Sequence, residues 1–295
     1  MCIYGNALLV YNPNARSAGE MLGTAAGILS PGIRKLTLMP TQEPGDTERI
    51  CRELGASYEL VVLLGGDGTV HEGVNGLAGL EKRPIVGIIP GGTCNDFARS
   101  LRIPIDPVQA AQAILDCRTA KIDLGQAGER YFSNFFGIGL ITETSENINP
   151  ELKGVFGKLS YFLSTLQKVT NASTFRFRLE MEQGTADGEA VMIFAANGRS
   201  IGTNVLPTPT DSLEDGMLDI FVIREAGIPL LVEILTQKAT QTWDPDKSKI
   251  DYYRANRFRL TTDEPMRADT DGEIYLETPI DVSVESELIT FAVGK

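Results

Sequence analysis

The chain has 295 residues, of which 42% are hydrophobic, and its formal net charge at pH 7 is −12. This length supports a large core and predicts two domains, while the acidic charge argues against nucleic acid as a partner and against purely electrostatic attachment to anionic membranes. No window reaches the apolar length of a bilayer span, the N-terminal residues lack the basic start of a signal peptide, and the four cysteines lack metal-ligand spacing. We therefore expect a soluble, cytoplasmic protein.

The first predicted element is a buried strand that begins near Ala7 and ends at Tyr11. Polar side chains follow it directly, namely Asn12, Asn14, Arg16 and Ser17. In open α/β sheets, ligands bind at the carboxyl ends of the strands. These side chains are therefore candidates for ligand binding.

The most informative stretch is a second buried strand, residues 60–64, followed by the turn Gly65-Gly66-Asp67-Gly68-Thr69. Three glycines within four positions let the backbone turn sharply, so that successive N–H groups point at one anion. A helix predicted from Val70 would direct its N-terminal dipole to the same place, and Asp67 would reach a metal or a water held by a polyphosphate. The motif is neither the dinucleotide fingerprint nor the P-loop, and a plain tight turn is the alternative.

Residues 84–90 repeat this pattern, because a buried strand runs into Gly91, Gly92 and Thr93 and then into a polar helix start at Asn95 and Asp96. Three strand ends with such loops favour one shared nucleotide-binding crevice over three unrelated turns.

The pattern of predicted helices and strands changes near residue 125. Before it, strands alternate with helices up to a helix at residues 107–115, which predicts a doubly wound parallel α/β domain. After it, strand patterns dominate and predict a β-sandwich domain. We expect these strands at residues 130–135, 175–181, 190–196, 218–223 and 257–262.

Two helices are predicted within the β region, at residues 157–168 and 228–235. The first lies in a locally basic stretch, residues 151–178, which has five Lys or Arg against one Glu. It is either a membrane-facing edge or an amphipathic helix laid on the sandwich with its lysines in water.

Two acidic segments in the second half are candidates for chemistry. Residues 210–219 form an acid-rich turn of the kind in which hard cations bind carboxylate and carbonyl oxygens, and a simple solvated turn is the alternative. Asp271 and Glu273 are two apart on a predicted strand and would face the same side, while Gly272 between them permits close approach. An Asp-Gly hairpin turn is the alternative for this segment.

Six motifs, in this order, resemble the diacylglycerol kinase catalytic-domain family, and specifically its soluble bacterial lipid kinases. They are Asn12-Pro13-Asn14, Gly65-Gly66-Asp67-Gly68-Thr69, Pro90-Gly91-Gly92-Thr93-Cys94-Asn95-Asp96-Phe97-Ala98, Asn134-Phe135-Phe136-Gly137-Ile138-Gly139, Glu214-Asp215-Gly216-Met217-Leu218-Asp219 and Asp271-Gly272-Glu273. NAD kinases share the second motif, but the third and the last favour the lipid branch. His71 stands where many family members have Asn, and we expect a local hydrogen-bonding residue there rather than a base.

The resemblance implies a site that uses ATP and Mg²⁺. It implies Glu273 as the proton acceptor and Asp271 as its partner in orienting the hydroxyl or the metal. It also implies that Asp215, with the backbone carbonyls of Ser212 and Met217, holds a structural Mg²⁺, and that Asp67 and Asp215 are linked through water to the catalytic metal. The residues implied to contact ATP are Asn12, Asn14, Arg16, Thr41, Gly65, Gly66, Asp67, Gly68, Thr69, Glu72, Gly92 and Thr93.

The resemblance further implies that the last strand, around residues 287–293, returns to the first domain. The expected domains are therefore residues 1–125 with 287–295, which bind ATP, and residues 126–286, which bind the lipid. The expected function is that of an ATP- and Mg²⁺-dependent lipid kinase at the inner face of the membrane, converting diacylglycerol to phosphatidic acid. Phosphatidylglycerol and a long-chain base stay open as acceptors, as does a homodimer formed through an exposed sandwich edge. A NAD-kinase-like enzyme with a soluble acceptor and a nucleotide-binding regulator without turnover are the alternatives.

Overall fold

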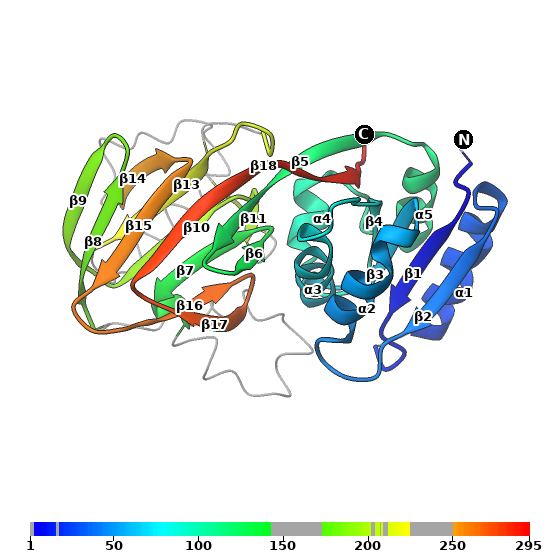
Figure 1. Cartoon of the computed structure of the whole chain (residues 1–295), viewed down its shortest axis with the longest axis horizontal. Helices are drawn as coiled ribbons and strands as arrows, with labels where there is room; N and C mark the ends of the chain where they lie inside the picture. The colour runs from blue at the N-terminus through cyan, green and yellow to red at the C-terminus, as the bar shows by residue number, and fades with distance from the viewer. Residues whose placement is uncertain are drawn as a thin grey trace. The chain divides into compact units, whose positions relative to one another are not determined.

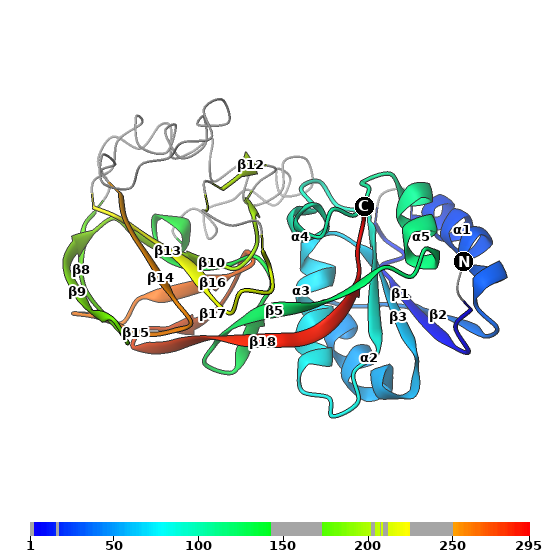
Figure 2. The same cartoon turned by 90° about the horizontal axis from the view of Figure 1, so that it is seen from above.

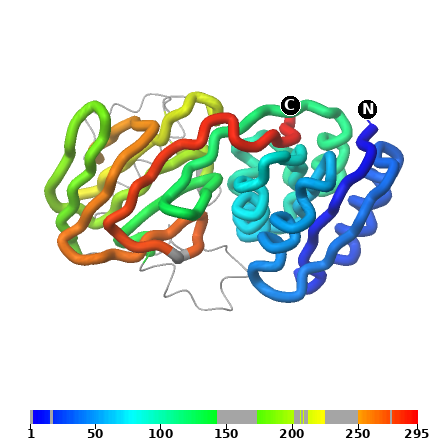
Figure 3. The backbone as a smooth tube through the Cα atoms, viewed as in Figure 1, coloured from blue at the N-terminus to red at the C-terminus, as the bar shows by residue number. Residues whose placement is uncertain are grey.

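The structure, a computed structural model, describes residues 3–15, 18–142, 173–201, 204–206, 208, 212–224 and 250–295. The chain divides into two compact units: unit 1 is Met1–Leu124 with Ser286–Lys295, and unit 2 is Gly125–Glu285. Strands β5 (Thr119–Ala127) and β18 (Ile280–Ala292) carry the chain from one unit to the other, and both chain ends belong to unit 1 (Figure 3). Arg16 and the two helices predicted at residues 157–168 and 228–235, with the basic stretch around the first, lie outside the described residues.

Unit 1 is a parallel sheet with helices on both faces, which confirms the predicted doubly wound α/β fold. Its strand order is β2-β1-β3-β4-β18, and the paired strands run parallel. Helices α1 and α5 cover one face, whereas α2 and α3 cover the other (Figures 1 and 2). Because helices cover both faces, the central strands are buried, as their continuous apolar sequences predict.

The strands of unit 1 before β5 are β1 (Ala7–Tyr11), β2 (Leu36–Pro40), β3 (Leu60–Gly65) and β4 (Ile85–Pro90). Its helices are α1 (Ala18–Leu29), η1 (Ser30–Gly32), α2 (Asp46–Leu54), η2 (Gly55–Ser57), α3 (Asp67–Ala78), α4 (Asp96–Ser100) and α5 (Pro107–Leu115). None of the helices in the described part of the chain combines the length and the apolar character needed to span a bilayer.

Unit 2 consists mainly of antiparallel strands in two layers, as predicted for a sandwich. One layer has the order β18-β15-β8-β9, with β5 and β6 beside β18, and the other has the order β14-β13-β10-β7-β16-β17. The strands are β6 (Arg130–Phe132), β7 (Phe135–Gly139), β8 (Phe175–Met181), β9 (Gly184–Ala190), β10 (Met192–Ala196), β11 (Ser200–Ile201), β12 (Asn204–Val205), β13 (Leu218–Ile223), β14 (Ile250–Ala255), β15 (Arg257–Thr262), β16 (Arg267–Thr270) and β17 (Glu273–Glu277).

The core of unit 2 is filled from both layers. Phe258 and Leu179 come from one sheet, and Phe136, Ile193 and Ile220 come from the other; all five are almost fully buried. Alternate residues of β7 and β13 point into this core, as the period of a strand requires. The remaining side chains of these strands therefore lie on the opposite face of their sheet.

Candidate active site

Polar residues follow four parallel strands of unit 1 at one edge of the sheet. The register pairs the last residue of β1, Tyr11, with Pro40 of β2 and Leu64 of β3, and it pairs Gly65 with Pro90 of β4. The segments that begin at residues 12, 41, 66 and 91 therefore leave the sheet side by side. The structure thus brings the predicted ATP-binding residues of these four segments, as far as they are described, to the same edge.

The two glycine-rich loops touch each other through their backbones. A Cβ atom placed on Gly92 would lie 2.6 Å from Cα of Gly66, and a Cβ atom placed on Gly66 would lie 3.0 Å from Cα of Gly92. The N–H of Gly91 also donates to the carbonyl oxygen of Gly65 over 2.8 Å. Side chains at these positions would push the loops apart, so glycine is required here by packing.

The carboxylate of Asp67 connects the two loops by hydrogen bonds. One oxygen accepts from the N–H of Asn95 at 2.8 Å, and the other accepts from the N–H of Asp96 at 2.7 Å. Hydrogen bonds to an ionised acceptor are among the stronger ones in proteins. Asp67 therefore positions the second loop, a role that the sequence pattern did not reveal.

Asn95 completes this arrangement from within the second loop. Its φ of 52° is in the left-handed region, which Asn tolerates better than most residues. Its Oδ1 accepts from the N–H of Gly92 and its Nδ2 donates to the carbonyl oxygen of Gly92, both at 2.9 Å. The sequence indicated Asn95 only as a capping residue, because the contact to Gly92 depends on the loop conformation.

The start of α3 is suited to hold an anion. Gly66 occupies the N-cap, and no side chain caps the helix. Gly68 is exposed, and a Cβ atom there would meet nothing within 4 Å. The first N–H groups of a helix carry partial positive charge, so the polyphosphate of a nucleotide fits this position.

The other predicted ATP contacts of unit 1 fall into two groups. Asn12, Asn14 and Thr93 are exposed, and the side chain of Asn12 accepts from the N–H of Asn14 at 2.8 Å. Thr41 is 8% exposed and its N–H donates to the carbonyl oxygen of Tyr11 at 2.9 Å. These residues line the edge described above, and direct contact of each with ATP stays a prediction.

Glu72 has a different environment from the one predicted. Its two carboxylate oxygens accept from the N–H groups of Gly45 at 3.0 Å and Thr47 at 3.1 Å. Glu72 thus accepts from backbone N–H groups at the start of α2. Its negative charge there interacts favourably with the positive end of the helix dipole. This geometry supports a structural role for Glu72 over a contact with ATP.

His71 is fully buried in α3. The Nδ2 atom of Asn75 donates to the carbonyl oxygen of His71 at 2.9 Å and lies 3.5 Å from its Nε2 atom. The local hydrogen-bonding role predicted for His71 is confirmed.

The contact between the glycine loops gives the first testable prediction. We expect Gly92→Ala to lower the affinity for ATP at least about tenfold, because the new methyl group would overlap Cα of Gly66. Equilibrium binding of a non-hydrolysable ATP analogue measures this. The matched control is Gly79→Ala, where a Cβ atom meets nothing within 4 Å; equal affinities of the two variants would contradict the prediction.

In unit 2, the segment from Asp271 to Glu273 differs from the expected strand. Asp271 and Gly272 form the two-residue turn between β16 and β17, and their φ angles are 54° and 91°. Positive φ at both positions is what a tight type I′ hairpin turn requires, and Asp-Gly is a preferred pair there. The prediction that Asp271 and Glu273 face the same side of one strand is therefore wrong, and the hairpin alternative is correct.

The carboxylate of Asp271 holds a backbone segment in place. It accepts from the N–H groups of Ser133, Asn134 and Phe135 at 2.7, 2.8 and 3.0 Å, and from the hydroxyl of Ser133 at 3.0 Å. The fully buried Asp269 supports the same turn, since its Oδ1 accepts from the N–H of Gly272 at 2.6 Å. Both acids thus fix the turn that leads into Glu273.

Glu273 is the first residue of β17, is half-buried and is paired in register with Thr270. Its position follows from the turn, because a tight two-residue turn leaves little freedom to the residue that follows it.

The hydrogen bonds of Asp271 give a second prediction. We expect Asp271→Asn to lower the free energy of unfolding of unit 2 by about 2–4 kcal/mol, because an amide has one acceptor oxygen for these four donors. Asn tolerates positive φ, so the change removes the charge without adding backbone strain. Chemical denaturation, followed by a spectroscopic signal that reports on the unfolding of unit 2, measures the effect. The control Asp281→Asn breaks an exposed ion pair with Arg259 and should cost at most about 1 kcal/mol; a similar loss in both variants would contradict the prediction.

The acidic loop around Asp215 was predicted to hold a structural Mg²⁺ with the carbonyls of Ser212 and Met217. In the structure, Oδ1 of Asp215 accepts from the N–H of Met217 at 3.1 Å, and Oδ2 lies 2.6 Å from Nη2 of Arg254. The side chain of Ser212 accepts from the N–H of Glu214 at 3.0 Å. The Asp215 carboxylate therefore has a cationic partner, Arg254, and the structural Mg²⁺ at this loop stays a prediction.

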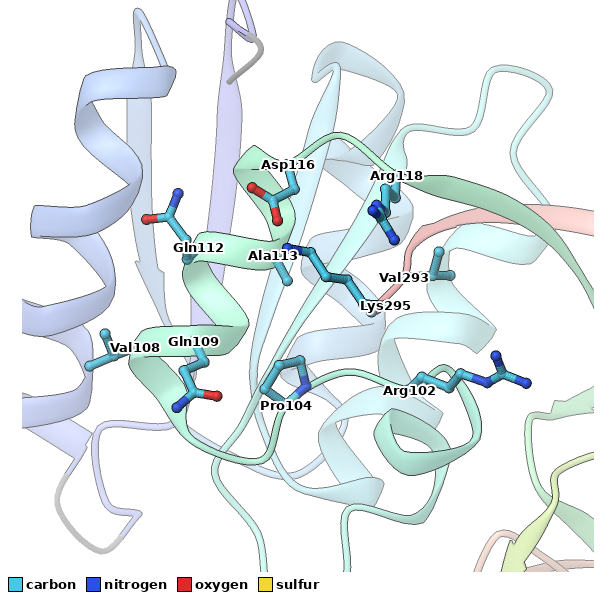
Figure 4. A pocket seen from close by; sticks show the side chains of 11 residues that line it. Arg102, Pro104, Val108, Gln109, Gln112, Ala113, Asp116, Arg118, Val293 and Lys295 are labelled. Atoms are coloured by element: carbon cyan, nitrogen blue, oxygen red, sulfur yellow. The ribbon is translucent and has the colours of Figure 1, made fainter.

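Unit 1 also contains a cavity of about 440 Å³ beside α5 (Figure 4). Its charged lining residues are Arg102, Asp116, Arg118 and Lys295, and its lining also includes Gly294, whose N–H donates to the carbonyl oxygen of Leu101. None of the residues predicted to bind ATP, metal or acceptor lines it. The cavity is therefore separate from the glycine-loop edge.

Two family models match the two parts of the chain separately. Residues 6–127 match the model of the diacylglycerol kinase catalytic domain, and residues 138–293 match that of the YegS C-terminal NAD kinase beta sandwich-like domain. A Staphylococcus aureus (strain MSSA476) protein named "Putative lipid kinase" is 33% identical over 288 residues, which cover 95% of this chain and 94% of that protein. The MW2 strain has a protein of the same description with the same identity and coverage.

Solved structures give the same result for the whole chain. A structure from Bacillus anthracis str. Sterne described as "a diacylglycerol kinases" has a TM-score of 0.88 and 34% identity, covering 99% of this chain and 97% of that one. Another from the same organism, titled "a putative diacylglycerol kinase", has a TM-score of 0.91 and 34% identity, and covers 100% of this chain and 97% of that one. Two matching domains and near-complete coverage at this identity show that the chain belongs to the diacylglycerol kinase catalytic-domain family of phosphotransferases.

Proposed function

We propose that this protein transfers the γ-phosphoryl group of ATP to a hydroxyl group of a membrane lipid, with diacylglycerol as the acceptor and phosphatidic acid as the product. The observation that carries the proposal is the glycine-loop edge of unit 1. There, two glycine loops are in backbone contact, and the first N–H groups of α3, which begins after Gly66 at the N-cap, are suited to a polyphosphate.

In this proposal, unit 1 binds and orients ATP. The N-terminal N–H groups of α3 would hold phosphate oxygens, and Asn12, Asn14, Thr41 and Thr93 would contact the remainder of the nucleotide. Mg²⁺ bound with ATP would neutralise part of the phosphate charge, and Asp67 is the carboxylate of this edge that would lie nearest to it.

Unit 2 would supply the base. Glu273 accepts the proton of the lipid hydroxyl, the hydroxyl oxygen forms a bond to the γ-phosphorus, and the bond from the γ-phosphorus to the bridging oxygen breaks to release ADP. Lipid hydroxyls are weak nucleophiles at neutral pH, so proton acceptance contributes roughly 10²–10⁴-fold. Asp271 acts here as a positioning residue, because its carboxylate is taken up by four donors of the segment Ser133–Phe135.

A membrane lipid as the acceptor is supported by the names of the relatives and by the family of the first domain. The acceptor would be reached by association with the inner face of the membrane, since diacylglycerol does not leave the bilayer readily. The second domain's likeness to the NAD kinase sandwich makes NAD the alternative acceptor.

The test is transfer of labelled γ-phosphate from Mg-ATP to diacylglycerol, phosphatidylglycerol and a sphingoid base in mixed micelles, with NAD in buffer alongside. We expect label in diacylglycerol. Label in another lipid would retain the reaction class and change the acceptor, whereas label only in NAD would overturn the proposal. ATP binding without transfer to any acceptor would favour a regulator.

A further inference from the structure

We infer that the guanidinium group of Arg254 is the resident cation of the acidic loop at residues 212–219, and that this loop needs no divalent metal. The inference is independent of the proposed acceptor, because it concerns contacts within unit 2. It follows from the disagreement between the metal predicted at Asp215 and the partners that Asp215 has in the structure.

Strand pairing fixes Arg254 opposite the loop. Arg254 lies on β14 and is paired in register with Asp219 on β13, so the two side chains are cross-strand neighbours. Its Nε lies 3.3 Å from Oδ1 of Asp219, and its Nη2 lies 2.6 Å from Oδ2 of Asp215. One guanidinium group therefore donates to Asp215 and lies within ion-pair distance of Asp219, although its buried Nε makes no hydrogen bond there.

The remaining donors around these carboxylates are also supplied by the protein. The N–H of Met217 donates to Asp215, and the hydroxyl of Tyr252 donates to Asp219. The side chains of Arg254, Asp215 and Asp219 are 28%, 25% and 13% exposed, so solvent screens this cluster less than it screens a surface ion pair. Gly216, with a φ of 68°, provides the turn that brings Asp215 back toward β13.

A divalent ion would compete with this arrangement. Mg²⁺ requires oxygen ligands at close to octahedral geometry, and the one carboxylate of the predicted donor set, that of Asp215, already accepts from Arg254 and from the N–H of Met217. An ion on Asp215 would also lie beside the guanidinium group, and the two positive charges would repel each other. Because Arg does not lose its proton in proteins, that repulsion is not relieved by deprotonation.

The consequence is a loop whose order depends on Arg254 and not on the metal concentration. Any requirement of the enzyme for Mg²⁺ would then arise from the nucleotide. Lys at this position would retain the charge but would place it on one nitrogen, whereas Arg254 directs two different nitrogens at Asp215 and Asp219.

The test is hydrogen exchange of the peptide that covers residues 212–224, measured on the full chain without nucleotide, in EDTA and then with excess Mg²⁺ or Ca²⁺. We expect the exchange rates of the wild-type peptide to be the same in all three conditions. We expect Arg254→Met to exchange at least about tenfold faster in EDTA, because two carboxylates lose their shared partner. Arg259→Met, which removes the exposed ion pair with Asp281 on a neighbouring sheet, is the matched control and should leave this peptide unchanged.

Slower exchange of the wild-type peptide with Mg²⁺ or Ca²⁺ that disappears in Asp215→Asn would overturn the inference and restore a metal site. Exchange in Arg254→Met equal to that in Arg259→Met would overturn it as well. If Arg254→Met does not fold, Arg254→Lys serves instead: we expect intermediate exchange that remains insensitive to metal, and metal-dependent protection in that variant would count against the inference.

Discussion

Glu273→Gln is expected to reduce turnover by at least about a hundredfold while the affinity for ATP stays nearly unchanged. The substitution retains the size of the side chain and removes the basic oxygen, so the lipid hydroxyl loses its proton acceptor. A base acts in the transition state and contributes little to nucleotide binding, so kcat falls and KM for ATP does not rise. Initial rates of phosphoryl transfer at saturating lipid, with a separate ATP-binding titration, measure both quantities.

The control for this variant is Glu277→Gln, at the exposed end of the same strand. It makes the same chemical change away from the turn and should retain normal turnover. Near-normal turnover in Glu273→Gln would remove Glu273 from the role of base.

The sequence predicted the α/β part of the fold well because its elements have strong local signals. The strands β1, β3 and β4 are continuous apolar runs that end in glycine or in Asn-Pro, and such runs are typical of buried parallel strands. In unit 2, the strands β8, β13 and β15 were predicted with the bounds that the structure has, because each alternates or is rich in β-branched and aromatic residues.

Other strands of unit 2 were not predicted from sequence. Strand β9, with the sequence GTADGEA, has two glycines and no aromatic or branched apolar residue, so its pairing with β8 and not its own propensity keeps it extended. Strands β16 and β17 were not predicted separately, because Asp271 and Gly272 were assigned to one continuous strand. Their positive φ angles depend on the hairpin that the neighbouring strand β7 supports.

The candidate site was predicted by residue type but not by partner. The glycines, Asp67 and Asp271 were indicated by spacing and resemblance. However, the N–H groups that donate to Asp67 lie at least 28 positions away in the chain, and those that donate to Asp271 lie at least 136 positions away. The same holds for Arg254, which is 39 positions from Asp215 and had no role in the predicted site. Contacts at such separations follow from the sheet register, which one sequence does not specify.

Asp67→Asn is expected to lower the affinity for ATP by about ten- to a hundredfold, both with Mg²⁺ and in EDTA. An amide side chain has one acceptor oxygen, so one of the two N–H groups now bound, that of Asn95 or that of Asp96, loses its partner. A hydrogen bond to a charged group contributes about 1.5–3 kcal/mol, and each 1.4 kcal/mol is tenfold in affinity. Because the second loop is positioned by these bonds, the loss would not depend on a metal.

Calorimetric titration with a non-hydrolysable ATP analogue, in EDTA and in excess Mg²⁺, separates the two roles considered for Asp67. The control Asp116→Asn changes an exposed carboxylate of the same unit and should bind the analogue like the wild type. If Asp67→Asn weakens only the Mg²⁺-bound form, the carboxylate is a metal ligand and its bonds to the second loop contribute little to ATP binding. If both forms are weakened equally, the Asp67 carboxylate acts by holding the glycine loops together, which is the result that its two short hydrogen bonds favour.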